Sequence, residues 1–486
     1  MTAIKFGTSG PRGIVGQEFT TKHVQAISLA VADLLLAKNK HPRIVLGCDP
    51  RKGNDPKLGA GSFTKTIVDI LISKGVMVDV FDSFAPTPLV SWYIRKYGLD
   101  GGLILTASHN PPEYNGIKFN PGNGAPAPSE VTQELELKAN QYYDREIKSL
   151  QIKDEKINFI NKNQEFAEDL IKNITKFCQL EKGALNFPVV VDAKHGTATS
   201  IWEEIFKILN IKKYKIINAE PKADFGGIEA NPTKISSLTD LKNKQKAFQA
   251  PIAIANDPDA DRHVILDENG DLVTPEEVCV IVLDYLVNKN IPVLGIASTV
   301  ASSNLIKTAC TTNGLEYAET AVGFKYFAPF LEKGVQENKI ALAVESSGGI
   351  SASFHILEKC GYLPGILLMG ILADTGQKLS ELKTELAKKY GKYYFKEDKY
   401  EFEATKKVAL VNFFREITKE NLKTKFKDPI SLINKTDGVK VEFENGDWFL
   451  FRLSGTEPMA RVYAETQSEQ QSDELVKQAK QIITFF

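Results

Sequence analysis

Short apolar runs that alternate with amphipathic helical segments recur along most of this chain, and no other feature limits the fold as strongly. In the first part, a helical pattern at residues 23–36 is followed by an apolar run at 43–48 and a second helical pattern at 63–73. Strands that are separated by helices usually pair in parallel, and the helices cover the resulting sheet. The alternation therefore predicts an α/β protein with mostly parallel sheets.

The alternation of apolar runs and helical segments restarts twice, and near the carboxy terminus it gives way to consecutive short strands. A chain of 486 residues is too long for one hydrophobic core and indicates three or four domains. A polar stretch at 148–164 is the expected linker after the first unit. A helical pattern at 365–390 precedes short strands, a hairpin signal at 444–447 and a closing helix at 472–485. We predict three related mixed α/β domains and a smaller carboxy-terminal α+β domain, at residues 1–150, 160–272, 273–388 and 392–486.

Composition excludes several classes of function. The 60 basic and 61 acidic residues give a net charge of -1, so no global field attracts nucleic acid or a membrane. No basic-then-apolar leader and no apolar run of about 18 residues is present, which predicts a cytoplasmic protein. The five cysteines are scattered without a Cys-x-x-Cys pair, so we expect neither disulfides nor a zinc site.

The first stretch that could carry chemistry is TASHNPPEYNGIK, at residues 106–118. Ser108 follows a predicted strand, where functional residues commonly lie. A serine reacts when a neighbouring base takes its proton or when it already carries the group to be transferred. His109 and Lys118, in the same glycine- and proline-punctuated loop, are candidates for the proton transfer. An ordinary turn is the alternative, because Ser, Asn and Pro are common in turns.

The second stretch, NDPDADR at residues 256–262, alternates three carboxylates directly after an apolar run. Asp257, Asp259 and Asp261 supply the hard oxygen ligands that suit Mg²⁺. An EF-hand calcium loop would use Glu268 as its twelfth residue, but Arg262 occupies the sixth position, where that loop needs glycine. A solvated acidic turn is the other alternative. The place at the end of a predicted strand favours a metal site.

Three further regions offer groups for an anion or a sugar. RLSGTEP, at residues 452–458, combines an arginine, two hydroxyl groups and a glycine, which favours phosphate binding. ESSGG, at 345–349, offers a carboxylate and hydroxyls for a sugar, although a flexible loop has the same composition. Arg12 and Lys325 lie in glycine-containing loops and could equally be surface cations. Neither glycine-rich nucleotide-binding motif is present, which argues against a nucleotide ligand.

In this order, these stretches resemble the motifs of the α-D-phosphohexomutase family, whose members interconvert sugar 1-phosphates and 6-phosphates. TASHNP with NGIK is similar to the phosphoserine loop of that family, DPDADR to its metal loop, ESSG to its sugar loop and RLSGTEP to its phosphate loop. The resemblance spans nearly the whole chain. It implies four domains around a central cleft, Mg²⁺ as cofactor, and a hexose 1,6-bisphosphate as intermediate and activator.

The resemblance also implies a role for each matching residue. Ser108 carries the phosphoryl group, and Arg12, His109 and Lys118 serve the reacting end, with Lys118 or His109 as general base. The implied metal ligands are Ser108, Asp257, Asp259 and Asp261. The implied substrate-binding residues are Arg262, Gly323, Lys325, Glu345, Ser347, Arg452, Ser454, Gly455, Thr456 and Arg461.

Departures from the family pattern bear on the choice of sugar. Val344 stands where a glycine is common, and Gly349 stands where members that handle mannose or glucosamine phosphates often have histidine. Glucose phosphate is therefore the expected substrate, with phosphomannomutase or phosphoglucosamine mutase activity as alternatives. A phosphatase using the same serine and a non-catalytic sugar-phosphate-binding protein remain alternatives of other classes. The expected partner is a hexose monophosphate, and the protein is expected to be a monomer or homodimer.

Overall fold

The computed structural model describes residues 4–7, 9–145, 147, 157–178, 180, 183, 185–423, 425–453 and 459–484. Internal contacts divide the chain into two compact units. The first contains residues 1–294 and 323–382, and the second contains residues 295–322 and 383–486. None of the described helices is both long and apolar enough to cross a membrane.

The first domain of the first unit is built on a six-stranded sheet. Its strands are, in spatial order, β1 (Arg12–Ile14), β5 (Tyr114–Pro121), β4 (Gly101–Leu105), β2 (Arg43–Cys48), β3 (Met77–Phe81) and β6 (Asn158–Ile160). The four strands from β4 to β6 pair in parallel, whereas β5 pairs antiparallel with both β4 and β1. The predicted parallel arrangement is thus confirmed for the centre of this sheet.

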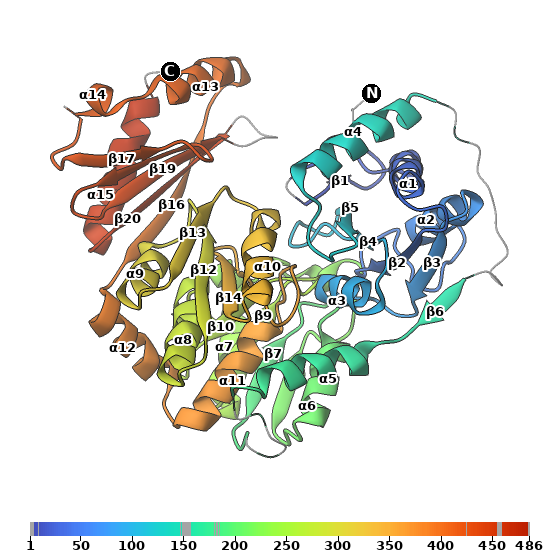
Figure 1. Cartoon of the computed structure of the whole chain (residues 1–486), viewed down its shortest axis with the longest axis horizontal. Helices are drawn as coiled ribbons and strands as arrows, with labels where there is room; N and C mark the ends of the chain where they lie inside the picture. The colour runs from blue at the N-terminus through green and yellow to red at the C-terminus, as the bar shows by residue number, and fades with distance from the viewer. Residues whose placement is uncertain are drawn as a thin grey trace. The chain divides into compact units, whose positions relative to one another are not determined.

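Helices cover both faces of this sheet because its central strands bury side chains on both sides (Figure 1). Ile44 and Leu46 of β2 share a core with α1 (Thr21–Leu36) and α2 (Phe63–Ser73), against which α4 (Ser129–Tyr143) also packs. The opposite face receives α3 (Thr87–Tyr97). A Cβ atom on Gly102 of β4 would lie 3.0 Å from Val90 of α3, so glycine permits this close packing.

Two predictions near this sheet need correction. The segment around Lys118 was expected to be a loop, but residues 114–121 form strand β5, because their polar side chains are buried by pairing with β4 and β1. Part of the expected linker at 148–164 lies outside the described residues. Its end is ordered, since Asn158–Ile160 form β6 beside β3 and helix α5 begins at Asn163.

The second domain has a five-stranded sheet. Its strands are, in spatial order, β11 (Leu272–Val273), β10 (His263–Leu266), β9 (Ile252–Asn256), β7 (Val189–Asp192) and β8 (Tyr214–Ile217). The pairs β7–β8 and β7–β9 are parallel, and β10 returns antiparallel beside β9. Its helices are α5 (Asn163–Ile174), α6 (Thr199–Ile208) and α7 (Thr239–Phe248), with short 3₁₀ helices η2 (Phe225–Gly227) and η3 (Ile235–Leu238). The turn between β9 and β10 carries the three aspartates.

The first unit also holds the elements that frame the predicted sugar loop. These are α8 (Pro275–Asn288), η4 (Phe324–Tyr326), α10 (Ala328–Gln336), the antiparallel pair β14 (Ile340–Glu345) and β15 (Gly349–Ala352), and α11 (Leu363–Thr375). Helix α11 is buried almost all round and packs against α8 and α5. The single helix expected at 365–390 is wrong, because the left-handed Gly376 (φ 69) ends α11 before α12 (Leu379–Tyr390) begins.

The second unit combines a parallel strand pair with an antiparallel carboxy-terminal sheet. The pair is β12 (Val293–Thr299) and β13 (Glu316–Thr320), connected by α9 (Asn304–Thr312). The sheet orders β16 (Tyr394–Glu401), β20 (Met459–Thr466), β19 (Trp448–Leu453), β18 (Val439–Phe443) and β17 (Ile430–Asn434). Its helices are η5 (Ala404–Lys406), α13 (Lys407–Glu416), α14 (Lys419–Leu422) and α15 (Glu469–Ile483). This is the predicted α+β domain.

Both faces of this sheet are covered, which explains the uninterrupted apolar run of β19. Phe449 and Phe451 face the core formed with α13 and α15, whereas Trp448 and Leu450 pack with Val300 and its neighbours. Side chains alternate between the faces of a strand, so an apolar residue at every position indicates burial on both sides.

Candidate active site

Ser108 lies in the turn that follows β4, with its side chain directed at the aspartate loop of the second domain. The Ser108 hydroxyl donates to Asp257 Oδ2 at 2.8 Å and lies 3.4 Å from His109 Nδ1. The Ser108 residue is 1% exposed and has a left-handed backbone (φ 52). Such a conformation is uncommon for serine and persists only where surrounding contacts hold it. The fold therefore brings together the predicted serine and the predicted metal loop.

The three aspartates are buried and converge. Oxygen atoms of Asp257, Asp259 and Asp261 all lie within 4.8 Å of one another. Among the described residues, Asp259 Oδ1 and Asp261 Oδ1 have no hydrogen-bond partner, although both atoms are buried. Burial and its two acidic neighbours raise the pKa of Asp257 well above its usual range. Unpartnered carboxylate oxygens in a buried cluster fit a hard divalent cation such as Mg²⁺.

Lys118 reaches this cluster from β5. Its ammonium lies 2.5 Å from Asp259 Oδ2 and 2.6 Å from Asp261 Oδ2. Burial disfavours the charge of Lys118, but the two carboxylates outweigh this effect and raise its pKa. Thr87, at the start of α3, also donates to Asp259 Oδ2 at 2.7 Å. Lys118 is thus a buried, charged residue in direct contact with the proposed metal ligands.

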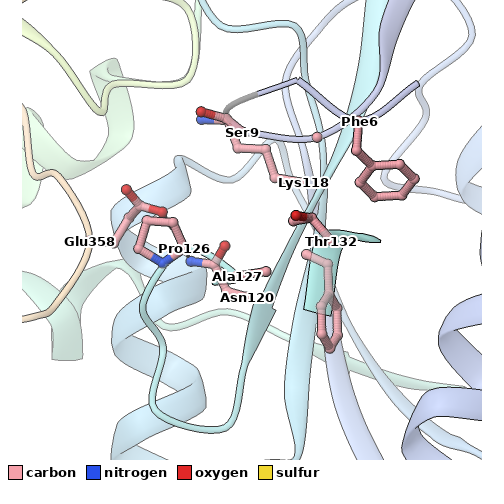
Figure 2. Close-up of a pocket in the computed structure, with 10 residues that line it drawn as sticks. Phe6, Ser9, Lys118, Asn120, Pro126, Ala127, Thr132 and Glu358 are labelled. Carbon is pink, nitrogen blue, oxygen red and sulfur yellow. Dashed lines mark hydrogen bonds between the residues drawn. The ribbon is translucent and has the colours of Figure 1, made fainter. Parts of the chain in front are cut away.

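A second buried lysine, Lys359, contacts the same loop and was missed in the sequence. Its ammonium lies 3.4 Å from Asp261 Oδ2 and 3.0 Å from Glu358 Oε1. Glu358 in turn accepts from Asn120 Nδ2 of β5 at 3.1 Å. Figure 2 shows Asn120 and Glu358 beside Lys118 at a pocket of about 10 Å³, which has room for at most one water molecule. This pocket is too small for a sugar.

Two arginines and a neutral histidine complete the cluster around Ser108. Arg12 of β1 donates from Nη1 to Asn110 Oδ1 at 2.8 Å. The Arg262 backbone N–H donates to Asp257 Oδ1 at 3.0 Å, and its Nε lies 3.8 Å from Asp261 Oδ1. The charge of Arg262, followed by burial and the charge of Arg12, lowers the pKa of His109 to about 2. His109 is therefore uncharged at neutral pH.

The predicted sugar loop lies directly beside the aspartate loop. The Gly348 carbonyl accepts the backbone N–H of His263 at 3.0 Å, one residue after Arg262. Ser347 Oγ lies 3.4 Å from Glu345 Oε2. A Cβ atom on Gly349 would lie only 2.4 Å from Cδ of Lys359, so any other residue at this position would force the lysine side chain to move.

The remaining predicted anion-binding residues lie on separate elements. Gly323 adopts φ 140 just before η4, and the Lys325 ammonium lies 5.3 Å from the ring centre of Tyr326. In the second unit, Arg452 Nε donates to Asp437 at 2.8 Å, and Asp437 also accepts the N–H of Val322. Arg461 pairs with Glu397 at 3.1 Å. Ser454, Gly455 and Thr456 lie outside the described residues.

The structure thus joins four predicted stretches in the first unit, namely those of Arg12, Ser108, the aspartates and Glu345. Sequence reasoning missed Thr87, Lys359 and Arg51, the last of which is fully buried behind the Ser108 turn. Asp49 and Arg51 follow β2 directly, so a paired acid and base at the end of a strand was a readable signal. No comparable sequence pattern marks Lys359.

Comparisons with known proteins agree with this arrangement. Models of phosphoglucomutase/phosphomannomutase alpha/beta/alpha domains I, II and III match residues 3–146, 164–270 and 274–390. The model of the phosphoglucomutase/phosphomannomutase C-terminal domain matches residues 397–482.

Two curated relatives and one solved structure extend the match to the full length. A phosphoglucomutase/phosphomannomutase of Thermococcus kodakarensis is 30% identical, with 97% of this chain and 96% of the relative covered. A phosphoglucosamine/phosphogalactosamine mutase of Sulfurisphaera tokodaii is 28% identical, with 98% of each covered. The crystal structure of a putative phosphomannomutase from Thermus thermophilus shares the fold, with a TM-score of 0.81, 24% identity and 99% of each chain covered. The chain therefore belongs to the α-D-phosphohexomutase family, whose members are intramolecular phosphotransferases built from four domains.

Proposed function

We propose that this protein is a Mg²⁺-dependent phosphohexomutase that interconverts glucose 1-phosphate and glucose 6-phosphate through a phosphoserine at Ser108 and a bisphosphate intermediate. The observation that carries the proposal is the contact between the Ser108 hydroxyl and Asp257, in a cluster where Asp259 and Asp261 each have a buried oxygen without a hydrogen-bond partner. A serine placed against carboxylates that could hold a divalent cation suits phosphoryl transfer, in which a cation neutralises charge on the transferred group.

The three aspartates and Ser108 would hold Mg²⁺, which when bound would neutralise charge on the phosphoryl group. The phosphoryl group leaves Ser108 Oγ as a bond forms from phosphorus to a free sugar hydroxyl. That hydroxyl loses a proton, and Ser108 Oγ regains one. Reversal of these steps at the other phosphate of the bisphosphate restores the phosphoserine.

The chain's own residues would divide the remaining tasks. Lys118 or His109 would act as general base toward the sugar hydroxyl, because both lie in the cluster of Ser108 and the aspartates. Arg12 and Arg262 would attract the reacting phosphate, and Glu345 with Ser347 would bind sugar hydroxyls. Arg452, Arg461 and residues 454–456 would bind the phosphate that does not react, and Gly323 and Lys325 would bind another part of the substrate.

The test is conversion of glucose 1-phosphate to glucose 6-phosphate with Mg²⁺ and a trace of glucose 1,6-bisphosphate. Ser108→Ala should abolish turnover, whereas Ser28→Ala, which removes a buried hydroxyl from α1, should not. Parallel assays with mannose and glucosamine 1-phosphates would identify the sugar, since selectivity is a ratio of kcat/KM values. Release of free phosphate at the rate of isomerisation would indicate a phosphatase, and absence of turnover on all three sugars would refute the proposal.

A further inference from the structure

We propose that Arg51 is a positioning residue that fixes the turn carrying Ser108, and that Phe225 of the second domain encloses it. The inference rests on the proposed role of Ser108. It assigns to a buried arginine behind the Ser108 turn the task of keeping the reactive hydroxyl in place. Arg51 is 0% exposed, so its charge and its five N–H groups must be satisfied inside the protein.

The Arg51 guanidinium contacts the Ser108 turn almost entirely through backbone carbonyl groups. Nη2 donates to the carbonyl of Ser108 at 2.5 Å and to that of Asn110 at 2.7 Å. Nη1 donates to the carbonyls of Pro111 at 2.7 Å and Tyr114 at 2.8 Å. One planar group therefore holds four carbonyls that point inward from a single turn.

A second set of contacts fixes the same turn from its amino-terminal side. Asp49 Oδ2 accepts Arg51 Nε at 3.0 Å and the Thr106 hydroxyl at 2.6 Å. Thr106 Oγ1 in turn accepts the backbone N–H of Ser108 at 2.8 Å. The N–H and the carbonyl of Ser108 are thus both tied to the Arg51–Asp49 pair. Ties on both sides of one residue can hold the left-handed backbone that directs its hydroxyl toward Asp257.

Phe225 closes the remaining side of the guanidinium. Its ring centre lies 4.8 Å from the central carbon of Arg51. Phe225 belongs to η2 of the second domain and is itself fully buried, with a left-handed backbone (φ 51). A cation enclosed by an aromatic face is stabilised further where water is excluded. The second domain, which carries the three aspartates, therefore also holds Arg51 in place through Phe225.

Lysine cannot replace arginine in this role. An ammonium has three donors from one point, whereas the guanidinium has five donors in a rigid plane. Arg51→Lys keeps the charge but leaves several inward carbonyls without a partner, so the turn should shift. A misplacement of about 1 Å can lower a rate by about 100-fold. We therefore expect kcat to fall by about that factor while KM for the sugar phosphate changes little, because the substrate-binding residues remain.

The experiment compares Arg51→Lys, Arg51→Ala and Thr106→Val with the wild type in the glucose 1-phosphate assay. Arg43→Lys is the control, because Arg43 begins β2, the strand that Arg51 follows, but pairs with Asp79 of β3 away from the turn. Methylguanidinium should restore part of the kcat of Arg51→Ala, and methylammonium should not, an outcome that a merely structural role would not produce. Thr106→Val keeps the side-chain shape and tests the turn even if the Arg51 variants fail to fold.

A folded Arg51→Lys variant with wild-type kcat would overturn the inference, and so would a Thr106→Val variant with wild-type kcat. Rescue of Arg51→Ala by methylammonium as well as by methylguanidinium would also contradict it. An inactive wild type would instead refute the proposed function. In that case hydrogen exchange at the Ser108 N–H still tests the inference, since its protection should fall in Arg51→Lys and persist in Arg43→Lys.

Discussion

Replacing Lys118 with methionine should tighten Mg²⁺ binding while it lowers the mutase rate. The Lys118 ammonium lies within 2.6 Å of oxygens of both Asp259 and Asp261, so it neutralises two of the proposed metal ligands. Mg²⁺–oxygen bonds are about 2.1 Å long, which puts a metal held by these carboxylates roughly 5 Å from the ammonium. At an effective dielectric constant of about 20, the two cations would repel by roughly 7 kcal/mol. Even a fifth of this repulsion is about 1.4 kcal/mol, or a tenfold lower Kd in the variant.

Isothermal titration of the phosphate-free protein with Mg²⁺ measures this effect directly. Lys194→Met is the matched control, because Lys194 is equally buried and pairs at 2.9 Å with Asp192, a residue outside the proposed metal cluster. Its Mg²⁺ affinity should equal that of the wild type. If Lys118→Met bound Mg²⁺ as weakly as the wild type, or more weakly, then the ammonium would not compete with the metal and the electrostatic reasoning would be wrong.

Three further outcomes follow from particular contacts. Gly349→Ala should lower kcat/KM about tenfold through its clash with Cγ and Cδ of Lys359, but should have little further effect in a Lys359→Ala background, which lacks both atoms, as a double-mutant cycle would show. Burial lowers the pKa of His355 to about 3. The uncharged His355 stabilises the folded protein fully above pH 6.5, and this stabilisation is lost as the pH falls toward 3. Between pH 7 and 5 the free energy of unfolding measured in urea should therefore fall by about 2 kcal/mol less in His355→Gln than in the wild type. Gly438→Ala should destabilise the carboxy-terminal sheet by more than about 2 kcal/mol in thermal unfolding, since its φ is 88 and the new Cβ would lie 2.0 Å from the carbonyl oxygen of Phe451.

Sequence periodicity predicted the elements whose burial follows a regular pattern. Helix α2 spans the predicted residues 63–73, because its apolar face repeats at helical spacing and Ser62 caps its first turn. Strand β5 was missed for the opposite reason, since Asn115, Lys118 and Asn120 are polar yet buried. Their burial depends on partners from distant strands and loops, which local sequence does not reveal.

The candidate site shows the same division. Its motifs could be found because each follows a strand and contains several chemically distinctive residues. The residues that support those motifs could not be found, because Arg51 contacts mainly backbone carbonyls and Lys359 pairs with Asp261, which is distant in the sequence. Each of these contacts is made by a single side chain, so it leaves no sequence pattern that extends over several positions.

The charge balance of the first unit would allow the proposed site to hold a phosphoryl group together with a divalent cation. Arg12, Lys118, Arg262 and Lys359 lie there among Asp259, Asp261, Glu345 and Glu358, and the raised pKa of Asp257 favours its uncharged form, so four cations face four carboxylates. A phosphoserine adds about two negative charges, and Mg²⁺ adds two positive ones. The phosphoryl group alone or Mg²⁺ alone would leave an excess of buried charge, whereas the two together leave the net charge of the site unchanged. Phosphorylation of Ser108 and Mg²⁺ binding should therefore favour each other by the same free energy. The phosphorylated protein should then bind Mg²⁺ more tightly than the protein stripped of phosphate.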